Sequence, residues 1–366
     1  VSGAAGGAVV SRVDSPEDYL AQMESMETEQ GPYADGLAEP LGSLGRYYRQ
    51  QGDFEQAQEA YRRALHIIRV NDGLYSERQI PLVRDLLATF RDAGDYEALD
   101  RRYEYLFRLY GAGRAPYTEL RMRAALEYLR WQREAMRMKL DGGGADRLLD
   151  AMEINDEILD GIEHAGSVPY AWRKRFVLSQ LRNLYILRDR FQPDTHENPL
   201  GSSRNVFVAQ PITVELRDQR LENLRQGAEV KARTLAEKLR QAAVAEGPVA
   251  EARLELAMAD WYFWNGKRGS AKTGYRRVAE LLRSAGEPGL VGEWLGQPVE
   301  LPEDGAFWAG RPSADAALAE VRASFNVSSR GRVSDIEVKA LNPGAEADLS
   351  RFKRNLNATL FRPRWD

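Results

Sequence analysis

Apolar and small side chains recur every three to four residues along the segment from Leu41 to Leu65. Its first half carries Leu41, Leu44, Gly45 and Tyr48, and its second half carries Phe54, Ala57, Tyr61, Ala64 and Leu65. This spacing places the apolar residues of each half on one face of a helix. Gly52 and Asp53 interrupt the pattern and supply a turn. The segment therefore predicts a helical hairpin whose apolar stripe neighbouring hairpins must cover.

Two further segments repeat this pattern. The second copy is Leu86–Phe107, with its turn at Gly94-Asp95, 42 residues after Gly52. The third copy is Leu256–Val278, with its turn at Asn265-Gly266. Repetition of one hairpin along a chain indicates an array in which each unit packs against the next.

In the first copy, the small residue Ala57 follows the turn glycine by five positions, and the aromatic residue Tyr61 follows four positions later. This arrangement resembles the tetratricopeptide repeat. The 42-residue offset is similar to extended variants of that family, whose second helix runs beyond the minimal unit of about 34 residues. The resemblance implies a mainly α-helical solenoid of about five hairpins over residues 33–285.

Degenerate copies are expected between the second and third recognisable ones. Helical periodicity predicts helices over residues 118–140, 145–163, 171–190 and 214–245. The last two are separated by a polar insertion, residues 191–211, where the other copies need a tight turn. The insertion is either mobile or an ordered contact loop, because it contains the short apolar run Val206-Phe207-Val208.

The ends of the array differ in composition from its interior. Residues 1–32 are expected to form a flexible segment followed by one helix, which begins at Pro16 and ends near Thr28. Residues 286–313 form a linker in which prolines and glycines are expected to remove helical options. Its aromatic residues, Trp294, Phe307 and Trp308, indicate that the linker packs against the rest of the chain.

The hydrophobic period changes from helical to alternating in residues 314–366. Apolar residues alternate with polar ones from Val321 to Val327, Ser329-Arg330-Gly331 makes a turn, and Val333, Ile336 and Val338 mark a second strand. Glu346–Asn357 then predicts an amphipathic helix, and Leu360–Trp365 closes the chain. The segment predicts a small α+β domain of a β-hairpin, a helix and a strand.

The strands FNVSSRGRV and SDIEVKA, the helix and the segment LFRPRW, in this order, resemble the C-terminal domain of the TonB family. The resemblance implies a Gram-negative envelope setting and a strand edge that pairs with a protein partner, an outer-membrane or envelope protein. TonB-like domains carry a further strand after this segment, so either the chain is cut short or that edge is open. The expected edge residues are Val333, Ile336, Val338 and Phe361. The alternative is a module that docks on the helical array.

Composition narrows the function classes. A formal charge of −4 and a pI near 5.7 argue against a nucleic-acid binder. The chain has no cysteine, and its three histidines stand far apart, so we expect no metal site and no cofactor. No apolar run is long enough to cross a bilayer. The start at Val1 fits either a mature terminus after signal-peptide removal or a truncated chain. The TonB resemblance implies an exported, periplasmic or envelope protein, and a cytoplasmic adaptor is the alternative.

No catalytic constellation emerges from the sequence. The glycines near residue 143 lie between predicted helices and not after a strand, and no nucleophile-elbow motif occurs. Acidic pairs such as Asp156-Glu157 lie on amphipathic helices, where solvent exposure explains them. The chain is therefore predicted not to be an enzyme.

The tetratricopeptide resemblance implies a binding groove lined by the first helix of each hairpin. Alignment on the turn glycines selects positions that face the groove: Arg46, Arg49, Gln50, Arg84, Arg91, Asp260, Phe263 and Trp264. The expected peptide-binding residues among them are Arg46, Arg49, Arg84, Arg91, Phe263 and Trp264. Four arginines at one end of the array indicate affinity for carboxylates. The alternative is a solvated helix face whose arginines pair with acidic residues of the same chain. The expected function is a non-enzymatic protein-interaction scaffold, and the alternative is a structural subunit that self-assembles as a homo-oligomer.

Overall fold

The computed structural model describes residues 16–140, 144–191, 212–305, 320–342, 346 and 349–364. The chain divides into two compact units, Val1–Tyr110 and Gly111–Asp366. This division falls inside the predicted array of residues 33–285. Within the described residues the fold is mainly helical, with successive helices packed as hairpins, followed by a small C-terminal region of two antiparallel sheets and a helix. The predicted fold class is confirmed at this level.

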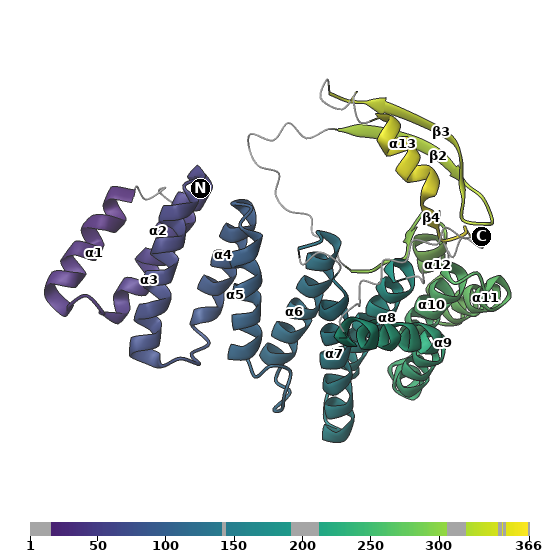
Figure 1. The fold of residues 1–366 in the computed structure, drawn as a ribbon, viewed down its shortest axis with the longest axis horizontal. Coiled ribbons are helices and arrows are strands. Elements are labelled where there is room, and N and C mark those ends of the chain that lie inside the picture. Colours follow the sequence, from purple (N-terminus) through teal and green to yellow (C-terminus); the bar gives the residue numbers. More distant parts are fainter. Residues whose placement is uncertain are drawn as a thin grey trace, which may run out of the picture. The chain divides into compact units, whose positions relative to one another are not determined.

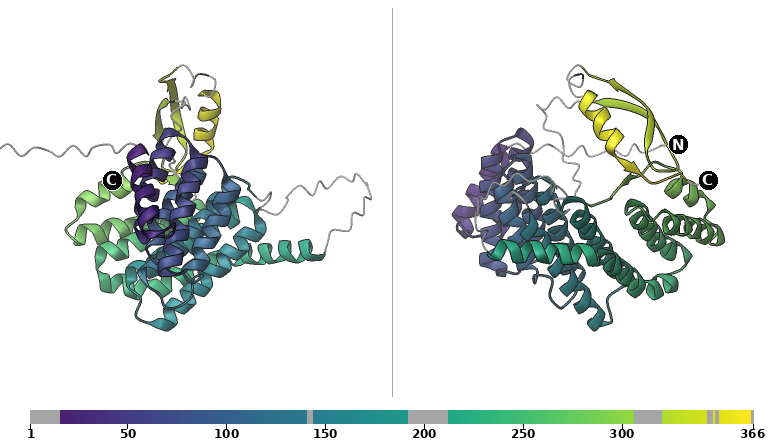
Figure 2. Two further views of the ribbon diagram at one scale, coloured as in Figure 1. Left: turned by 90° about the vertical axis from the view of Figure 1, so that its left-hand side faces the viewer. Right: turned by 45° about the vertical axis from the view of Figure 1, so that its right-hand side comes forward.

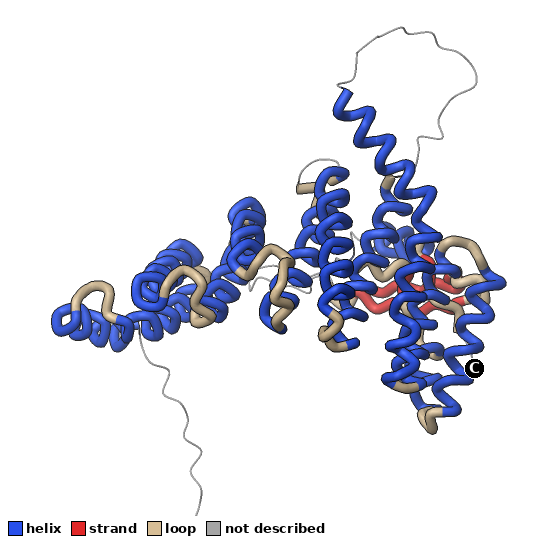
Figure 3. The backbone as a smooth tube through the Cα atoms, turned by 90° about the horizontal axis from the view of Figure 1, so that it is seen from below, coloured by secondary structure: helices blue, strands red, loops and turns tan. Residues whose placement is uncertain are grey.

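The first unit is a row of helices joined by short loops (Figures 1 and 3). Its elements are α1 Pro16–Gln30, the 3-10 helix Asp35–Leu37, α2 Ala38–Gln51, α3 Phe54–Asp72, α4 Gln79–Asp92 and α5 Tyr96–Leu109. Each helix packs on the next one along the chain. Two predicted hairpins are therefore present, α2 with α3 and α4 with α5.

Local chemistry explains the sharp turn of the first hairpin. Gly52 ends α2 with φ +81°, a conformation that favours glycine, and its N–H donates to carbonyls of the last turn. The Asp53 carboxylate then accepts from the N–H of Gln56 at 3.3 Å and caps α3. Gly94 and Asp95 repeat both features between α4 and α5. The turn that the sequence pattern predicts is thus fixed by residues within four positions of each other.

In the described part of the second unit, successive helices again pack as hairpins (Figures 1 and 2). Its first helices are α6 Glu119–Arg137, α7 Ala145–Ala165, α8 Tyr170–Arg190, α9 Ile212–Glu246, α10 Pro248–Trp264, α11 Arg268–Ser284 and α12 Pro288–Leu295. One core cluster joins α7 to α10 around Leu184, Leu239 and Trp261, and another joins α10 to α12 around Tyr275 and Leu282. The predicted helices at 118–140, 145–163, 171–190 and 214–245 correspond to α6 to α9.

The predicted linker departs from expectation. Residues 288–295 form α12 although the segment is rich in proline and glycine. Pro288 occupies the start of this helix, where a missing N–H costs no intrahelical hydrogen bond. Trp294 is buried, as expected, and the guanidinium of Arg253 lies 4.2 Å from the centre of its ring. Phe307, Trp308 and the run Val206-Phe207-Val208 lie outside the described residues.

The C-terminal region contains β1 Glu300–Leu301, β2 Val321–Val327, β3 Val333–Ala340, α13 Leu349–Ala358 and β4 Leu360–Phe361. β2 and β3 pair as the predicted hairpin, and α13 packs against β3 (Figure 2). β4 pairs with β1 in a separate antiparallel sheet, in register Glu300 to Phe361. The closing strand therefore joins the segment after α12 and does not extend the hairpin.

A bulge in β3 explains the irregular spacing of its apolar residues. The register shifts by one residue opposite Phe325, where Asp335 has φ +53° and its carboxylate accepts from the Asn326 amide at 2.9 Å. One extra residue reverses the alternation of side chains. As a result Val333 before the bulge and Ile336 after it both face the covered side of the hairpin, despite their spacing of three.

Candidate functional site

The arginines that sequence alignment assigns to a groove lie on α2 and α4 of the first unit. Arg46 donates to Asp85 at 3.2 Å and Arg49 donates to Asp92 at 2.7 Å, so each links α2 to the first helix of the next hairpin. Arg84 is exposed and Arg91 is half-buried, and both have interaction partners within the chain. For Arg46 and Arg49 the geometry agrees with the alternative of acidic partners on the same chain. Exposed pairs of this kind contribute about 0–1 kcal/mol each.

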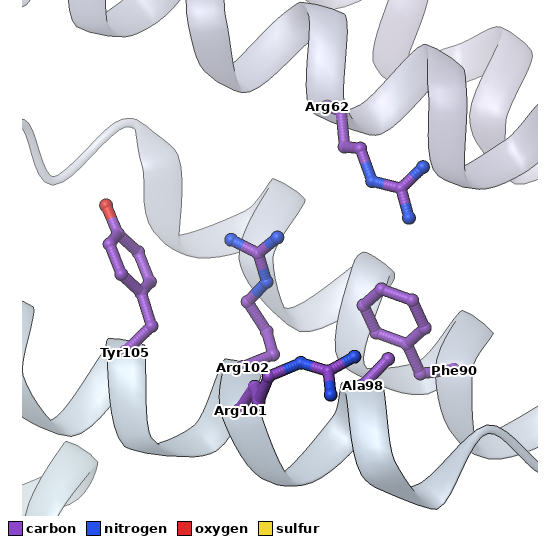
Figure 4. Close-up of a pocket in the computed structure, with 6 residues that line it drawn as sticks. All are labelled: Arg62, Phe90, Ala98, Arg101, Arg102 and Tyr105. Carbon is purple, nitrogen blue, oxygen red and sulfur yellow. The ribbon is translucent and has the colours of Figure 1, made fainter.

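A second group of arginines lies on α3 and α5, the second helices of the same two hairpins. Figure 4 shows Arg62 of α3 facing Arg102 of α5 across a hollow of about 350 Å³, with the rings of Phe90 and Tyr105 on either side. Ala98 and Arg101 complete the lining. The sequence interpretation missed this group because Arg62 and Arg102 are 40 residues apart and belong to second helices.

The C-terminal segment is fixed to the helices by a buried ion pair. Arg362 Nε donates to Asp260 Oδ1 at 2.8 Å and Arg362 Nη2 donates to Oδ2 at 2.5 Å, while Nη1 donates to the Trp294 carbonyl at 2.6 Å. The Tyr275 hydroxyl also donates to Asp260 Oδ1, at 2.9 Å. Both charged side chains are about nine-tenths buried, with 9% and 11% exposed. This bidentate arrangement satisfies each buried charge in a fixed geometry.

Burial and pairing act against each other at this ion pair. Burial raises the pKa of Asp260, and the hydrogen bonds and charge of Arg362 offset part of the rise. For Arg362, burial would lower the pKa, but the hydrogen bonds and charge of Asp260 raise it above its usual value. The guanidinium therefore stays charged, and removing it would leave a buried carboxyl without its counter-ion.

The turn of the β2–β3 hairpin is also seated on the helices. Phe361 N donates to the Gly331 carbonyl at 2.8 Å, and the side chain of Phe263 lies directly beside Gly331. A Cβ atom on Gly331 would come within 2.2 Å of the Phe361 carbonyl, so this approach requires glycine. Phe263, one of the expected groove residues, is 3% exposed and lies in this contact between the hairpin turn and α10, which we call the joint. Asp260 belongs to the joint as well.

Trp264, the other aromatic groove residue, is half-buried against Tyr185, with ring centres 5.2 Å apart. It lines a hollow of about 490 Å³ that also involves Arg188, Arg332 and Leu360. The hollow lies where the ends of α8 and α10 meet the start of β4. The structure thus separates the expected groove residues into a face on α2 and α4, a buried joint and this hollow.

The four expected edge residues divide into two groups. Val333 and Phe361 are buried, and Phe361 is paired with β1. Ile336 and Val338 are half-buried on the side of β3 that α13 covers. Among the residues that the structure describes, no strand pairs with the outer edge of β2 or of β3.

The hydrogen-bond register shows which backbone groups face outward at these edges. Leu341 N donates to the Glu320 carbonyl, so this pair of residues is hydrogen-bonded. Because bonded and non-bonded pairs alternate in an antiparallel ladder, the pairs Val321–Ala340 and Ala323–Val338 are non-bonded. The N–H and carbonyl groups of Ala323 and Ala340 therefore point away from the hairpin, one on each edge.

Comparison with known proteins supplies no assignment, since no protein-family model and no curated protein matches the chain. Within the described ranges, no helix combines the length and apolar character needed to cross a membrane. In the same ranges no cluster of three or more His, Asp or Glu side chains is arranged to hold a metal ion.

Proposed function

We propose that this protein is a non-enzymatic interaction scaffold of the bacterial cell envelope, in which the β2–β3 hairpin captures an extended segment of a partner protein. The observation that carries the proposal is a strand edge with outward N–H and carbonyl groups on a hairpin that is fixed to helices. Such an edge pairs with a peptide through main-chain hydrogen bonds. A fixed edge binds with less loss of conformational entropy than a mobile one.

Two resemblances support the setting. The hairpins of α2 to α5 and of α10 and α11 follow the tetratricopeptide pattern, which is typical of protein-binding scaffolds. The order of hairpin, helix and FRP segment is similar to the TonB family, whose C-terminal domains bind outer-membrane receptors. Subcellular fractionation of cells that produce the protein tests the compartment, and recovery in the cytosol would contradict the envelope assignment.

We expect a proline at one outer edge of the hairpin to abolish peptide binding. Ala323→Pro and Ala340→Pro each remove one outward N–H without removing a ladder hydrogen bond, because proline is tolerated at sheet edges. The two variants are matched, since both replace a half-buried alanine, and each serves as the control for the other edge. The measurement is binding of the full chain to a displayed library of peptides from envelope proteins.

The expected result is a set of peptides that bind the wild type and one proline variant but not the other. Equal binding of both variants and the wild type would contradict the edge assignment. In the same assay, replacing Arg46, Arg49, Arg84 and Arg91 together by alanine tests the face on α2 and α4. If the fourfold alanine variant loses peptide binding and both proline variants keep it, the binding site lies on the face of α2 and α4 and not on the strand edge.

A second candidate function, self-assembly, has its own observation. Leu216, Val230 and Val244 of α9 are more than half exposed, and they recur every 14 residues, which places them near one face of the helix. Exposed apolar residues along one helix face suit contact with a second copy. Light scattering over a range of concentrations distinguishes the candidates, because a monomer at all concentrations excludes self-assembly. Val230→Glu should dissociate an oligomer formed through this face.

A further inference from the structure

The hollow between α3, α4 and α5 contains positive charges that the rest of the described chain does not neutralise. Arg101 pairs with Glu97. Arg62 donates to the neutral amide of Gln58 at 2.8 Å. Arg69 likewise donates to Gln79 at 2.8 Å. In the part of the chain that the structure describes, no carboxylate forms an ion pair with Arg62, Arg69 or Arg102.

Aromatic rings hold these guanidinium groups beside the hollow. Arg62 lies 5.9 Å from the ring centre of Phe90. Arg69 and Arg102 lie 5.3 and 5.4 Å from the ring centre of Tyr105. Cation–π contacts fix the arginines in place but leave their charge uncompensated. Arg62 and Arg102 therefore line the hollow, and Arg69 shares the Tyr105 ring with Arg102 beside it.

The energetic cost of this arrangement is visible at Arg102. Burial lowers the pKa of Arg102, and the neighbouring charges of Arg69 and Arg62 lower it further. Two buried polar atoms of the group, Arg69 Nη2 and Tyr105 Oη, have no hydrogen-bond partner among the described residues. Buried polar groups are normally satisfied, so the cluster lacks a partner that would supply negative charge and acceptor atoms.

We propose that this hollow binds the phosphate group of a small molecule. A phosphate monoester carries close to two negative charges at neutral pH, which suits the unpaired guanidinium groups of Arg62 and Arg102 in the hollow and of Arg69 beside it better than a single carboxylate does. Guanidinium groups also match phosphate oxygens with paired N–H donors. The volume of about 350 Å³ exceeds that of a phosphate group, and the rings of Phe90 and Tyr105 offer apolar walls for an organic body. This site is separate from the proposed strand edge, and neither proposal depends on the other.

The test is calorimetric titration of the full chain at constant ionic strength with inorganic phosphate, sulfate, acetate and phenyl phosphate. We expect the dianions phosphate and sulfate to bind at least about tenfold more tightly than acetate, because charge-assisted bonds dominate. Tighter binding of phenyl phosphate than of inorganic phosphate would assign the site to an organic phosphate, and the reverse would assign it to the free ion. Equal affinities for phosphate and acetate, or no binding of phosphate, would overturn the proposal.

Variants of single arginines locate the binding. Arg102→Gln and Arg62→Gln should each weaken phosphate binding about tenfold or more. Arg108→Gln is the matched control, because Arg108 lies on the same helix and already pairs with Glu104.

Removing one of three like charges should also leave the melting temperature of ligand-free Arg102→Gln at or above that of the wild type. Arg62 is exposed, so Arg62→Gln keeps the test valid if Arg102→Gln does not fold. Unchanged affinity in a folded variant would overturn the assignment.

Discussion

Replacing Arg362 by methionine is expected to lower the free energy of unfolding by about 3–5 kcal/mol, because it leaves the buried Asp260 carboxylate without its counter-ion. Urea unfolding of the full chain measures the loss. Arg351→Met is the matched control, since Arg351 is exposed on α13, and it should change stability by less than about 0.5 kcal/mol. The double variant Asp260→Leu with Arg362→Met should recover much of the loss, because it removes both buried charges.

The same variant should acquire a distinctive pH dependence. Without Arg362, the pKa of Asp260 in the folded state rises further. Burial and the charge of Glu303 raise this pKa, while the Tyr275 hydrogen bond still lowers it. A carboxyl with a raised folded pKa contributes stability that is fully present below its unfolded pKa of about 4 and is lost as the pH rises. The stability deficit of Arg362→Met should therefore be smallest near about pH 4 and grow towards about pH 7. A deficit that does not change over this range would contradict the assigned role of the pair.

Gly45→Ala is expected to destabilise the first unit by about 1–3 kcal/mol, the cost of forcing extra volume into a packed core. A Cβ atom at this position would lie 2.7 Å from Cε1 of Tyr61, whose side chain is fully buried, so the ring or the helix must shift. Thermal or urea unfolding measures the effect.

Gly227→Ala is the matched control for this prediction. Gly227 also lies inside a helix, α9, but a Cβ atom there meets nothing within 4 Å. Helix propensity alone then applies, and the variant should be about 0.5–1 kcal/mol more stable than the wild type. The two identical substitutions should thus act in opposite directions. A destabilised Gly45→Ala that is not partly relieved by Tyr61→Leu in the same chain would contradict the proposed contact.

The helical hairpins could be predicted because their signals are local. The turn at Gly52 and Asp53 depends on one backbone conformation and one cap, and both act within a few residues. The helix α12 could not be predicted from the proline and glycine content of its segment, because Pro288 acts through its single position in the first turn of the helix. The bulge at Asp335 is visible in the sequence, because the apolar residues Val333 and Ile336 are three positions apart in a strand that otherwise alternates.

The candidate sites were harder to predict, because their residues are far apart in the sequence and come into contact only when the helices and the C-terminal segment pack together. Alignment on turn glycines placed Phe263 and Asp260 in an open groove, but the hairpin turn and Arg362 cover them. Arg362 belongs to the FRP segment that the resemblance singled out. Nothing in the segment itself indicates that its arginine reaches a carboxylate 102 residues away.

Periodicity, caps and turn residues act over a few positions, so the helical hairpins, their turns and the β-hairpin could be predicted from the sequence. Which charges meet depends instead on how the elements pack. The stacking of α3 against α4 and of α4 against α5 brought Arg62 and Arg102 to one hollow and Arg69 to the same Tyr105 ring as Arg102, without a paired carboxylate among the described residues. The docking of the C-terminal segment paired Arg362 with Asp260 and left the hairpin edges without a strand partner among the described residues. Such pairings depend on distances through space, which no local pattern in a single sequence encodes.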